Sequence, residues 1–204
     1  MKRRYASKMA SSETLYPVLL PVPDIGCGLK GREKMRCLQA WAHKALVRSA
    51  QESGVFLTRF EKAKNGAPLP ENGVFWSVSH KETFVAAVVA PAPVGIDVEP
   101  IRPRSKALFR KVADDREWQL TEGDKTLRFF RYWTAKEAVL KAAGDGLSGL
   151  SGCRIEADCD ENYMTVAYRG KHWEVEQYFF QGHIASVTRG PFRISWVLVE
   201  SPAT

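Results

Sequence analysis

Two acidic side chains, Asp97 and Glu99, stand two positions apart in the stretch Val94–Glu99, which is followed by Pro100. The β-branched residues of this stretch and the proline after it predict a short strand. Because side chains alternate between the two faces of a strand, both carboxylates lie on one face, about 7 Å apart along the backbone. Two carboxylates at this spacing are costly unless a cation compensates them. The pair is therefore a candidate cation site.

A third acid, Glu137, occurs in the stretch Trp133–Lys141, whose composition is typical of a helix. Glu137 and Lys141 are four positions apart, so they share one helix face. If that face meets the end of the strand, three carboxylates converge with a lysine one turn away. Oxygen ligands of this kind suit Mg²⁺, which binds a few carboxylates together with water and phosphate oxygens. The alternative is that these are ordinary surface acids, with Glu137 paired to Lys141 or Lys136.

Ser79 and His80 follow a predicted strand, and such a strand end can present a hydroxyl, a backbone N–H and an imidazole to a phosphate. A structural role for the histidine is the alternative. The sequence holds no Gly-x-Ser-x-Gly elbow, Gly-x-x-x-x-Gly-Lys-Ser/Thr phosphate-binding loop or Cys/His metal spacing. These absences argue against a serine hydrolase, a P-loop enzyme and a zinc protein.

The composition is that of a globular domain with a basic surface. The chain has 204 residues, a hydrophobic fraction of 45% and a formal net charge of +7. The charge favours an acidic partner, with nucleic acid, coenzyme phosphates and acidic proteins as alternatives. Without an apolar run long enough for a bilayer and without a secretory pattern, we expect a cytoplasmic protein that needs no membrane. The four cysteines form no Cys-x-x-Cys pair, so we expect free thiols.

The order of predicted elements indicates an α+β fold with two similar lobes, 1–100 and 101–204. We expect residues 1–13 to be loosely ordered. Long amphipathic helices are predicted at Arg32–Ser49 and Asp124–Ala143. A short helix is predicted at Lys106–Ala113, and Asp114 or Asp115 is expected to cap the turn that follows it. Lys62–Asn72 is expected to be a loop. In the first half, strands are predicted at Thr14–Leu20, Val55–Phe60, Val74–Ser79, Phe84–Ala90 and Val94–Glu99, the last three as an antiparallel meander. In the second half, they are predicted at Arg154–Ala157, Tyr163–Tyr168, His172–Gln181, His183–Thr188 and Arg193–Val199.

The acids of Val94–Glu99 stand at the junction of the two lobes, and the helix with Glu137 belongs to the second. A metal ion held by both lobes would lie in a cleft between them. The aromatic residues around Arg131 fall at helical spacing, so core packing explains them better than base stacking.

Three segments, taken together, resemble the motifs of the 4′-phosphopantetheinyl transferases: Phe75–His80, Val94–Glu99 and Phe130–Lys141. The long early helix fits the family more loosely. Within the superfamily, the sequence is similar to the longer, single-chain, two-lobed type that serves carrier proteins of fatty-acid, polyketide or peptide synthesis. The resemblance implies two α+β halves related by a pseudo-twofold axis, each a long helix on a small antiparallel sheet, with the active site in the cleft between them. A chain with its own cleft is expected to act as a monomer.

The resemblance also implies a reaction in which coenzyme A donates 4′-phosphopantetheine to a serine of an apo carrier protein, with Mg²⁺ as cofactor and 3′,5′-ADP as the other product. Asp97, Glu99 and Glu137 would hold the metal. Glu137 is the candidate general base, with Glu99 as the alternative, and Lys141 would neutralise phosphate charge.

Ser79 and His80 would bind the 3′-phosphate of the coenzyme, and Arg36 is a further candidate for the same surface. The sequence departs from the family's Gly-Lys-Pro at Ala67, so the coenzyme contact of that lysine is lost or passes to Lys64. It also departs at Lys81, where the family usually has serine, which adds a cation near the nucleotide.

The carrier protein is expected to be acidic, and Arg102, Arg104 and Arg110, just after the acidic strand, are candidate docking residues. Two rival functions are a basic nucleic-acid-binding protein and an inactive relative that only binds coenzyme A or a carrier protein. Acids at the point where the motifs converge disfavour the first, because they repel phosphate. The acids and Lys141 together disfavour the second.

Overall fold

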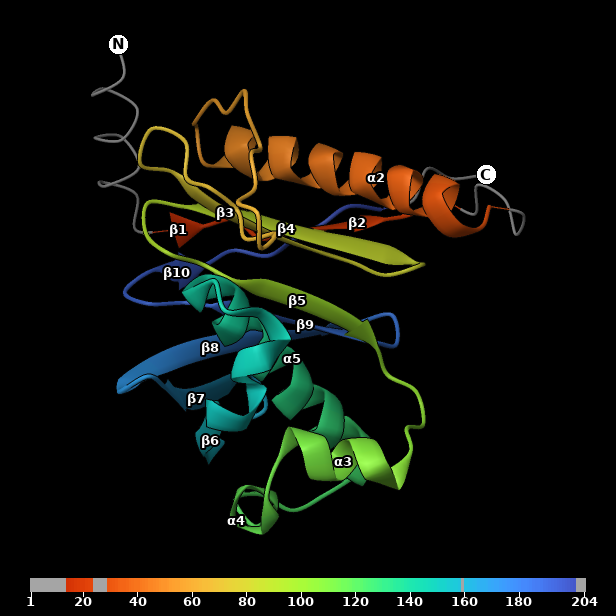
Figure 1. Ribbon diagram of the computed structural model, residues 1–204, viewed down its shortest axis with the longest axis vertical. Helices are drawn as coiled ribbons and strands as arrows, with labels where there is room; N and C mark the ends of the chain where they lie inside the picture. Colours follow the sequence, from red (N-terminus) through yellow and green to blue (C-terminus); the bar gives the residue numbers. More distant parts are fainter. Residues whose placement is uncertain (1–13, 24–28, 159, 201–204) are drawn as a thin grey trace. The chain divides into compact units, whose positions relative to one another are not determined.

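The computed structural model describes residues 14–23, 29–158 and 160–200 (Figure 1). The described residues divide into two compact units: the residues up to Pro93 together with those from Phe192 form the first, and Val94–Pro191 forms the second. This division differs from the predicted one at residue 100, because the acidic strand pairs within the second unit. The predictions for residues 1–13, Cys27 and Cys159 lie outside the described residues, and the described Cys37 and Cys153 are free thiols.

The first unit packs one long helix on an antiparallel sheet that is extended by a parallel strand. Its elements are β1 (Thr14–Leu15), β2 (Val18–Pro21), α2 (Gly31–Glu52), β3 (Phe75–His80), β4 (Phe84–Ala90), β10 (Arg193–Ile194) and β11 (Val197–Leu198). The main sheet has the order β11-β2-β4-β3, and β1 pairs with β10. The predicted apolar stripe of α2 is confirmed at Leu38, Ala42, Ala45 and Leu46, which are buried, whereas Met35 is 43% exposed.

Of the strand predictions for this unit, one is wrong and two are wrong in part. Val55–Phe60 is not a strand, although Val55 and Leu57 are buried. The backbone N–H groups of Thr58 and Arg59 donate to the carboxylate of Glu71, at 3.1 and 2.8 Å, instead of to a neighbouring strand. Val55 and Leu57 are therefore buried although the backbone of this segment does not pair with a strand.

The strand predicted at Arg193–Val199 is two short strands, β10 and β11, which pair in parallel with β1 and β2. The strand predicted at Thr14–Leu20 is likewise divided into β1 and β2. Pro17 lies between them, and its missing N–H explains the break.

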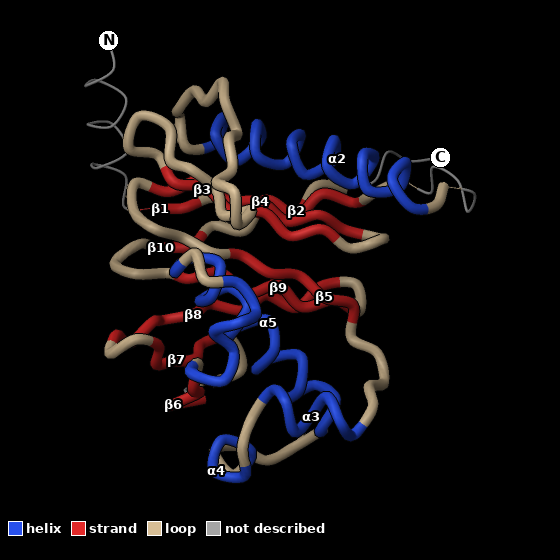
Figure 2. Tube along the Cα trace, viewed as in Figure 1, coloured by secondary structure: helices blue, strands red, loops and turns tan. Residues whose placement is uncertain are grey.

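The second unit is a fully antiparallel sheet with helices packed on one face. Its elements are β5 (Ile96–Pro100), α3 (Lys106–Val112), α4 (Asp115–Trp118), α5 (Lys125–Ala143), the 3₁₀ helix η1 (Gly146–Gly152), β6 (Arg154–Asp158), β7 (Tyr163–Tyr168), β8 (Lys171–Phe180) and β9 (His183–Thr188). The strand order is β5-β9-β8-β7-β6 (Figure 2). The expected class, α+β with long helices on antiparallel sheets, is confirmed.

The predicted meander of three strands holds only for β3 and β4. β5 does not join them, because it pairs with β9 from Ile96↔Val187 to Pro100↔His183. Asp97 and Glu99 consequently belong to the same sheet as β6–β9 and to the same unit as Glu137. The expectation that the acids come from two different lobes is thus wrong for this division of the chain.

Helix α5 has the ends that the sequence predicts. The side chain of Asp124 accepts a hydrogen bond from the N–H of Leu127 at 2.7 Å, and Gly144 ends the helix in the left-handed conformation, with φ 78°. Phe130, Tyr132 and Leu140 have 0% exposure and pack in the core of the unit. Among the described helices, none is both long and apolar enough to cross a membrane.

Candidate active site

Asp97 and Glu99 lie on the face of β5 that α5 covers. They pair across the sheet with Ser186 and Ile184 of β9, and paired residues of an antiparallel sheet share a face. The hydroxyl of Ser186 lies 2.6 Å from that of Thr134 on α5, which identifies the face. Both acids are buried, with exposures of 3% and 4%. The predicted pair of carboxylates on one face is confirmed.

The carboxylate of Asp97 is held by the predicted lysine. The Nζ of Lys141 lies 2.7 Å from Oδ1 of Asp97 and donates a second hydrogen bond to the carbonyl oxygen of Ile96 at 2.9 Å. Because the aspartate is buried, this ammonium group balances a charge that water reaches poorly. One cation therefore joins α5 to the backbone and the side chain of β5.

Two other groups hold the carboxylate of Glu99. The indole N–H of Trp133 donates to Oε1 at 3.0 Å, and the guanidinium of Arg104 lies 3.6 Å from Oε2. The same guanidinium stands over the ring of Phe130, 5.2 Å from its centroid. Each acid of β5 is thus balanced by a different positively charged side chain.

Glu137 lies between these two contacts along α5. Trp133, Glu137 and Lys141 are spaced by four residues, so they form one stripe on the helix. The first contacts Glu99 and the last contacts Asp97, so the stripe that carries Glu137 faces β5. Glu137 is half-buried. The structure therefore brings the helix turn of the third predicted acid to the face that carries the other two.

Gly95 allows the close approach of α5 to the start of β5. A Cβ atom at this position would lie 1.8 Å from the carbonyl oxygen of Ala138 and 2.7 Å from the nitrogen of Ala142. Both are backbone atoms of the helix, which side-chain rotation cannot move. A side chain at residue 95 would push away the helix turn that follows Glu137.

The donor set has the chemistry of a site for a hard divalent cation. Asp97 and Glu99 are buried carboxylates on one face, and the Glu137 stripe faces them. Within residues 14–23, 29–158 and 160–200, however, no three Asp, Glu, His or Cys side chains already form a group that could hold a metal. In this structure Lys141 and Arg104 balance the acids of β5. The residues present fit Mg²⁺ in type and in the face that they share.

The other predicted site residues belong to the first unit. Ser79 is buried and His80 half-buried at the end of β3, while Arg36 and Lys64 are exposed. Lys34 of α2 forms an ion pair with Glu82, in the turn directly after β3. The structure thus brings the first turns of α2, which carry Arg36, to the same end of the sheet as His80.

Lys64 lies on a tight turn of the first unit. The N–H of Ala63 donates to the carbonyl oxygen of Ala67 at 2.8 Å, and that of Gly66, with φ +84°, to the carbonyl oxygen of Ala63 at 2.9 Å. Lys64 is thus an exposed residue of a turn that two backbone hydrogen bonds close.

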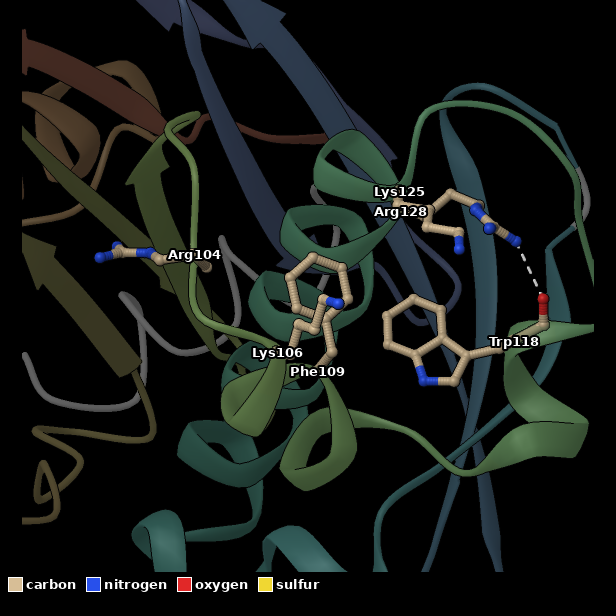
Figure 3. A pocket seen from close by; sticks show the side chains of 6 residues that line it. All are labelled: Arg104, Lys106, Phe109, Trp118, Lys125 and Arg128. Carbon is tan, nitrogen blue, oxygen red and sulfur yellow. Dashed lines mark hydrogen bonds between the residues drawn. The ribbon is translucent and has the colours of Figure 1, made fainter.

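A pocket of about 440 Å³ opens beside the residues that follow β5 (Figure 3). It is lined by Arg104, Lys106, Phe109, Trp118, Lys125 and Arg128. The rings of Phe109 and Trp118 are 5.7 Å apart between centroids, and Arg128 donates to the carbonyl oxygen of Trp118 at 2.9 Å. Figure 3 shows that Arg104 extends away from these rings. An apolar floor surrounded by basic side chains suits an anionic partner that carries an apolar group.

Two contacts of the site were not predicted. Trp133 was assigned to core packing, yet its indole also donates to Glu99. Trp133 is four residues from Glu137 and so shares its helix face, a sequence signal that could have placed Trp133 in the site. Arg104 was predicted only as a docking residue, and no sequence signal indicates its contact with Glu99.

Comparisons with known proteins converge on one family. A family model described as the 4′-phosphopantetheinyl transferase superfamily matches residues 93–194. The 4′-phosphopantetheinyl transferase HetI of Nostoc sp. is 35% identical over 109 residues, which cover 48% of this chain and 46% of that protein. The 4′-phosphopantetheinyl transferase psf-1 of Bacillus pumilus is 35% identical over 99 residues, covering 45% and 42%.

The 4′-phosphopantetheinyl transferase Sfp of Bacillus subtilis is 31% identical over 98 residues, covering 44% of this chain and 43% of that protein. The chain thus spans about half the length of the curated relatives named here. The residues matched by the family model include β5 and α5, which carry the acids and Lys141.

Proposed function

Because the chain belongs to the 4′-phosphopantetheinyl transferase superfamily, we propose that it transfers 4′-phosphopantetheine from coenzyme A to a serine hydroxyl of an apo carrier protein. In this reaction the serine oxygen forms a bond to the phosphorus that carries pantetheine. The bond from that phosphorus to the bridging oxygen of the diphosphate breaks, and 3′,5′-ADP leaves. The serine proton passes to a base of the enzyme. Such a transfer depends mainly on positioning and on neutralisation of charge.

One observation carries the proposal: the Trp133–Glu137–Lys141 stripe of α5 meets the two buried acids of β5 through contacts at both of its ends. Surface acids with no common role would not need to be buried on one face. Nor would they need a helix fastened to that face at 2.7 Å and 3.0 Å.

Asp97, Glu99 and Glu137 would hold Mg²⁺, whose positive charge would offset the repulsion of three carboxylates at one site. When bound, the metal supplies positive charge to the diphosphate of the donor. Two of the three ligands come from one strand and the third from the facing helix. Removal of any one of them is expected to weaken binding of the metal.

Glu137 is the proposed base that accepts the serine proton, directly or through a water molecule. It is half-buried, whereas Glu99, the alternative, is buried and already accepts a hydrogen bond from Trp133. A base must reach the proton that it removes, so the more exposed acid is the better candidate. Lys141 would place its ammonium group near the phosphate under attack while it orients Asp97.

Ser79 and His80 would bind the 3′-phosphate of coenzyme A, with Arg36 on the same surface and Lys64 as a further cation. The ion pair of Lys34 with Glu82 supports this grouping, because it holds the start of α2 near the end of β3. The pseudo-twofold relation of two lobes and a coenzyme cleft stay predictions of the family resemblance. A crystal structure with coenzyme A tests both.

The acceptor would be an acidic carrier protein. Arg102 and Arg110 are exposed, and Arg104 lines the pocket with the rings of Phe109 and Trp118. These features support docking of an acidic surface that also presents an apolar side chain. Arg104 contacts Glu99 as well, so an acceptor bound there would lie close to the proposed site.

Incubation with coenzyme A, Mg²⁺ and a panel of apo carrier proteins tests the function directly. Mass spectrometry of each carrier is expected to show a gain of one phosphopantetheine on its serine for at least one member. A carrier with that serine replaced by alanine is the control. If fatty-acid, polyketide and peptide carriers all keep their apo mass while a known transferase modifies them, the proposal fails.

A further inference from the structure

Lys136 carries a positive charge in the interior of the second unit. Of the lysines that the structure describes, it alone is buried, with 1% of its surface exposed. Its Nζ donates to the carbonyl oxygen of Val112 at 2.6 Å and lies 2.5 Å from Oε1 of Glu117, which is 4% exposed. Burial lowers the pKa of Lys136, and the hydrogen bond and charge of Glu117 oppose that shift. The lysine is one half of a buried ion pair.

Glu117 joins three elements at one carboxylate. Its Oε1 accepts from the N–H of Ile155 on β6 at 2.8 Å, and its Oε2 accepts from the N–H of Asp114 at 2.9 Å in the capping box of α4. The hydroxyl of Tyr132 on α5 donates to the backbone carbonyl of the same glutamate at 3.0 Å. The ion pair therefore fixes α5 against parts of the unit that are themselves held together.

The position of Lys136 determines which way its neighbour points. Adjacent residues of a helix are rotated by about 100° from each other. With Lys136 fixed at Glu117, the next residue, Glu137, turns toward β5. On the sheet side, the contact of Thr134 with Ser186, at 2.6 Å, limits rotation in the other direction.

Stability alone does not explain this pair. Two charges lose hydration on burial, and apolar residues of similar volume often stabilise a protein as well or better. An apolar contact, however, tolerates small rotations of a helix that a directional ion pair does not. We propose that Lys136, through Glu117, is a positioning residue that holds Glu137 toward Asp97 and Glu99. This inference rests on the proposed function of those acids.

The main test removes both charges at once, with Lys136→Met and Glu117→Gln in the same chain. The glutamine keeps one acceptor oxygen, which serves the N–H of Ile155 or that of Asp114 but not both, so some stability is lost and urea unfolding first checks that the variant still unfolds cooperatively. The Mg²⁺ concentration for half-maximal transfer is expected to rise about tenfold or more, the size of effect typical of groups that orient metal ligands. A double variant with the wild-type Mg²⁺ dependence and rate would overturn the proposal.

A single-variant comparison decides the matter if the double variant does not fold. Lys136→Met is compared with Val139→Ala, a change in a fully buried residue of the same helix, at a temperature where circular dichroism shows both folded. Only the lysine variant is expected to need more Mg²⁺. Equal Mg²⁺ dependence in the two variants would contradict a positioning role.

Failure of the proposed function would look different. If the wild-type protein transfers nothing, Mn²⁺ binding in the presence of coenzyme A replaces activity as the measurement for the same variants. Binding weakened about tenfold in the double variant would still support positioning. Unchanged Mn²⁺ binding would refute it, whatever reaction the protein catalyses.

Discussion

The Nζ of Lys141 lies 2.7 Å from Oδ1 of Asp97, so a cation of α5 is bonded to an aspartate of β5 that is 3% exposed. The lysine side chain is itself 26% exposed, so solvent still reaches it. This ion pair joins the two elements that carry the proposed site.

Replacement of Lys141 by methionine is expected to leave the charge of Asp97 without its ammonium partner. We expect the free energy of unfolding to fall by about 1–3 kcal/mol in EDTA, because the lysine is partly exposed and the full cost of breaking a buried pair does not apply. Added Mg²⁺ is expected to restore part of that loss. Urea unfolding with EDTA and with Mg²⁺ measures both, and Lys171→Met, at an exposed lysine, is the control. Equal stability of Lys141→Met and wild type in EDTA would contradict the account.

The hydrogen bond from Trp133 to Glu99 makes a second prediction. Trp133→Phe keeps an aromatic ring but removes the N–H, and we expect a loss of about 1–2 kcal/mol with a higher Mg²⁺ requirement. Trp173→Phe is a matched control, because the indole N–H of Trp173 has no hydrogen-bond partner among the described residues. If both variants need the same Mg²⁺ as wild type, Trp133 does not hold the acid in place.

Gly95→Ala is expected to destabilise the second unit by about 1–3 kcal/mol or more, because the new methyl group meets the backbone of α5. Chemical denaturation and the rate of transfer are both expected to report the displaced helix. Gly152→Ala is the control, since its Cβ would lie 3.5 Å from the nearest atom, a ring carbon of Tyr168. A Gly95→Ala protein with the stability of this control would refute the close approach.

Cys153 and Cys37 are expected to differ in their reaction with iodoacetamide. Burial raises the pKa of Cys153 to about 12, whereas Cys37 is partly exposed. At pH 9 only about one Cys153 thiol in a thousand would be ionised, and the thiolate is the reactive form. Peptide mapping at pH 9 is expected to find Cys37 alkylated and Cys153 unmodified until urea unfolds the protein. Equal labelling of the two in the native protein would contradict this environment for Cys153.

The sequence predicts the helices of this protein well, for local reasons. Asp124 and Gly144 mark the ends of α5, and a cap was expected at Asp114 or Asp115, of which Asp114 caps α4. The alternation of Asp97 and Glu99 on one face of a strand likewise follows from strand geometry alone.

The partners of the strands could not be predicted in the same way. β5 pairs with β9, which is distant in sequence, and nothing in Val94–Glu99 distinguishes that partner from the nearby β4. Similarly, Val55 and Leu57 are buried two residues apart, which is the pattern of a strand. The backbone N–H of Thr58 nevertheless donates to the side chain of Glu71 and not to another strand. Both outcomes depend on tertiary contacts that a local pattern does not contain.

The predicted acids and Lys141 share one face, but their immediate partners were found only in the structure. The contacts of Glu99 with Trp133 and Arg104 depend on the crossing of α5 over β5. The pairing of Lys136 with Glu117 depends on the packing of α4. The types of residue in a site can thus be read from a motif more readily than the groups that orient them.

The central claim is that carboxylates of β5 and α5 together hold one divalent cation. The most direct test measures the binding of Mn²⁺ by electron paramagnetic resonance, with coenzyme A present. Wild type is expected to bind one Mn²⁺, and Asp97→Asn and Glu137→Gln are each expected to weaken binding about tenfold or more. Glu174→Gln, at an exposed acid of β8, is expected to bind as wild type does. Undiminished Mn²⁺ affinity in Glu137→Gln would contradict the claim.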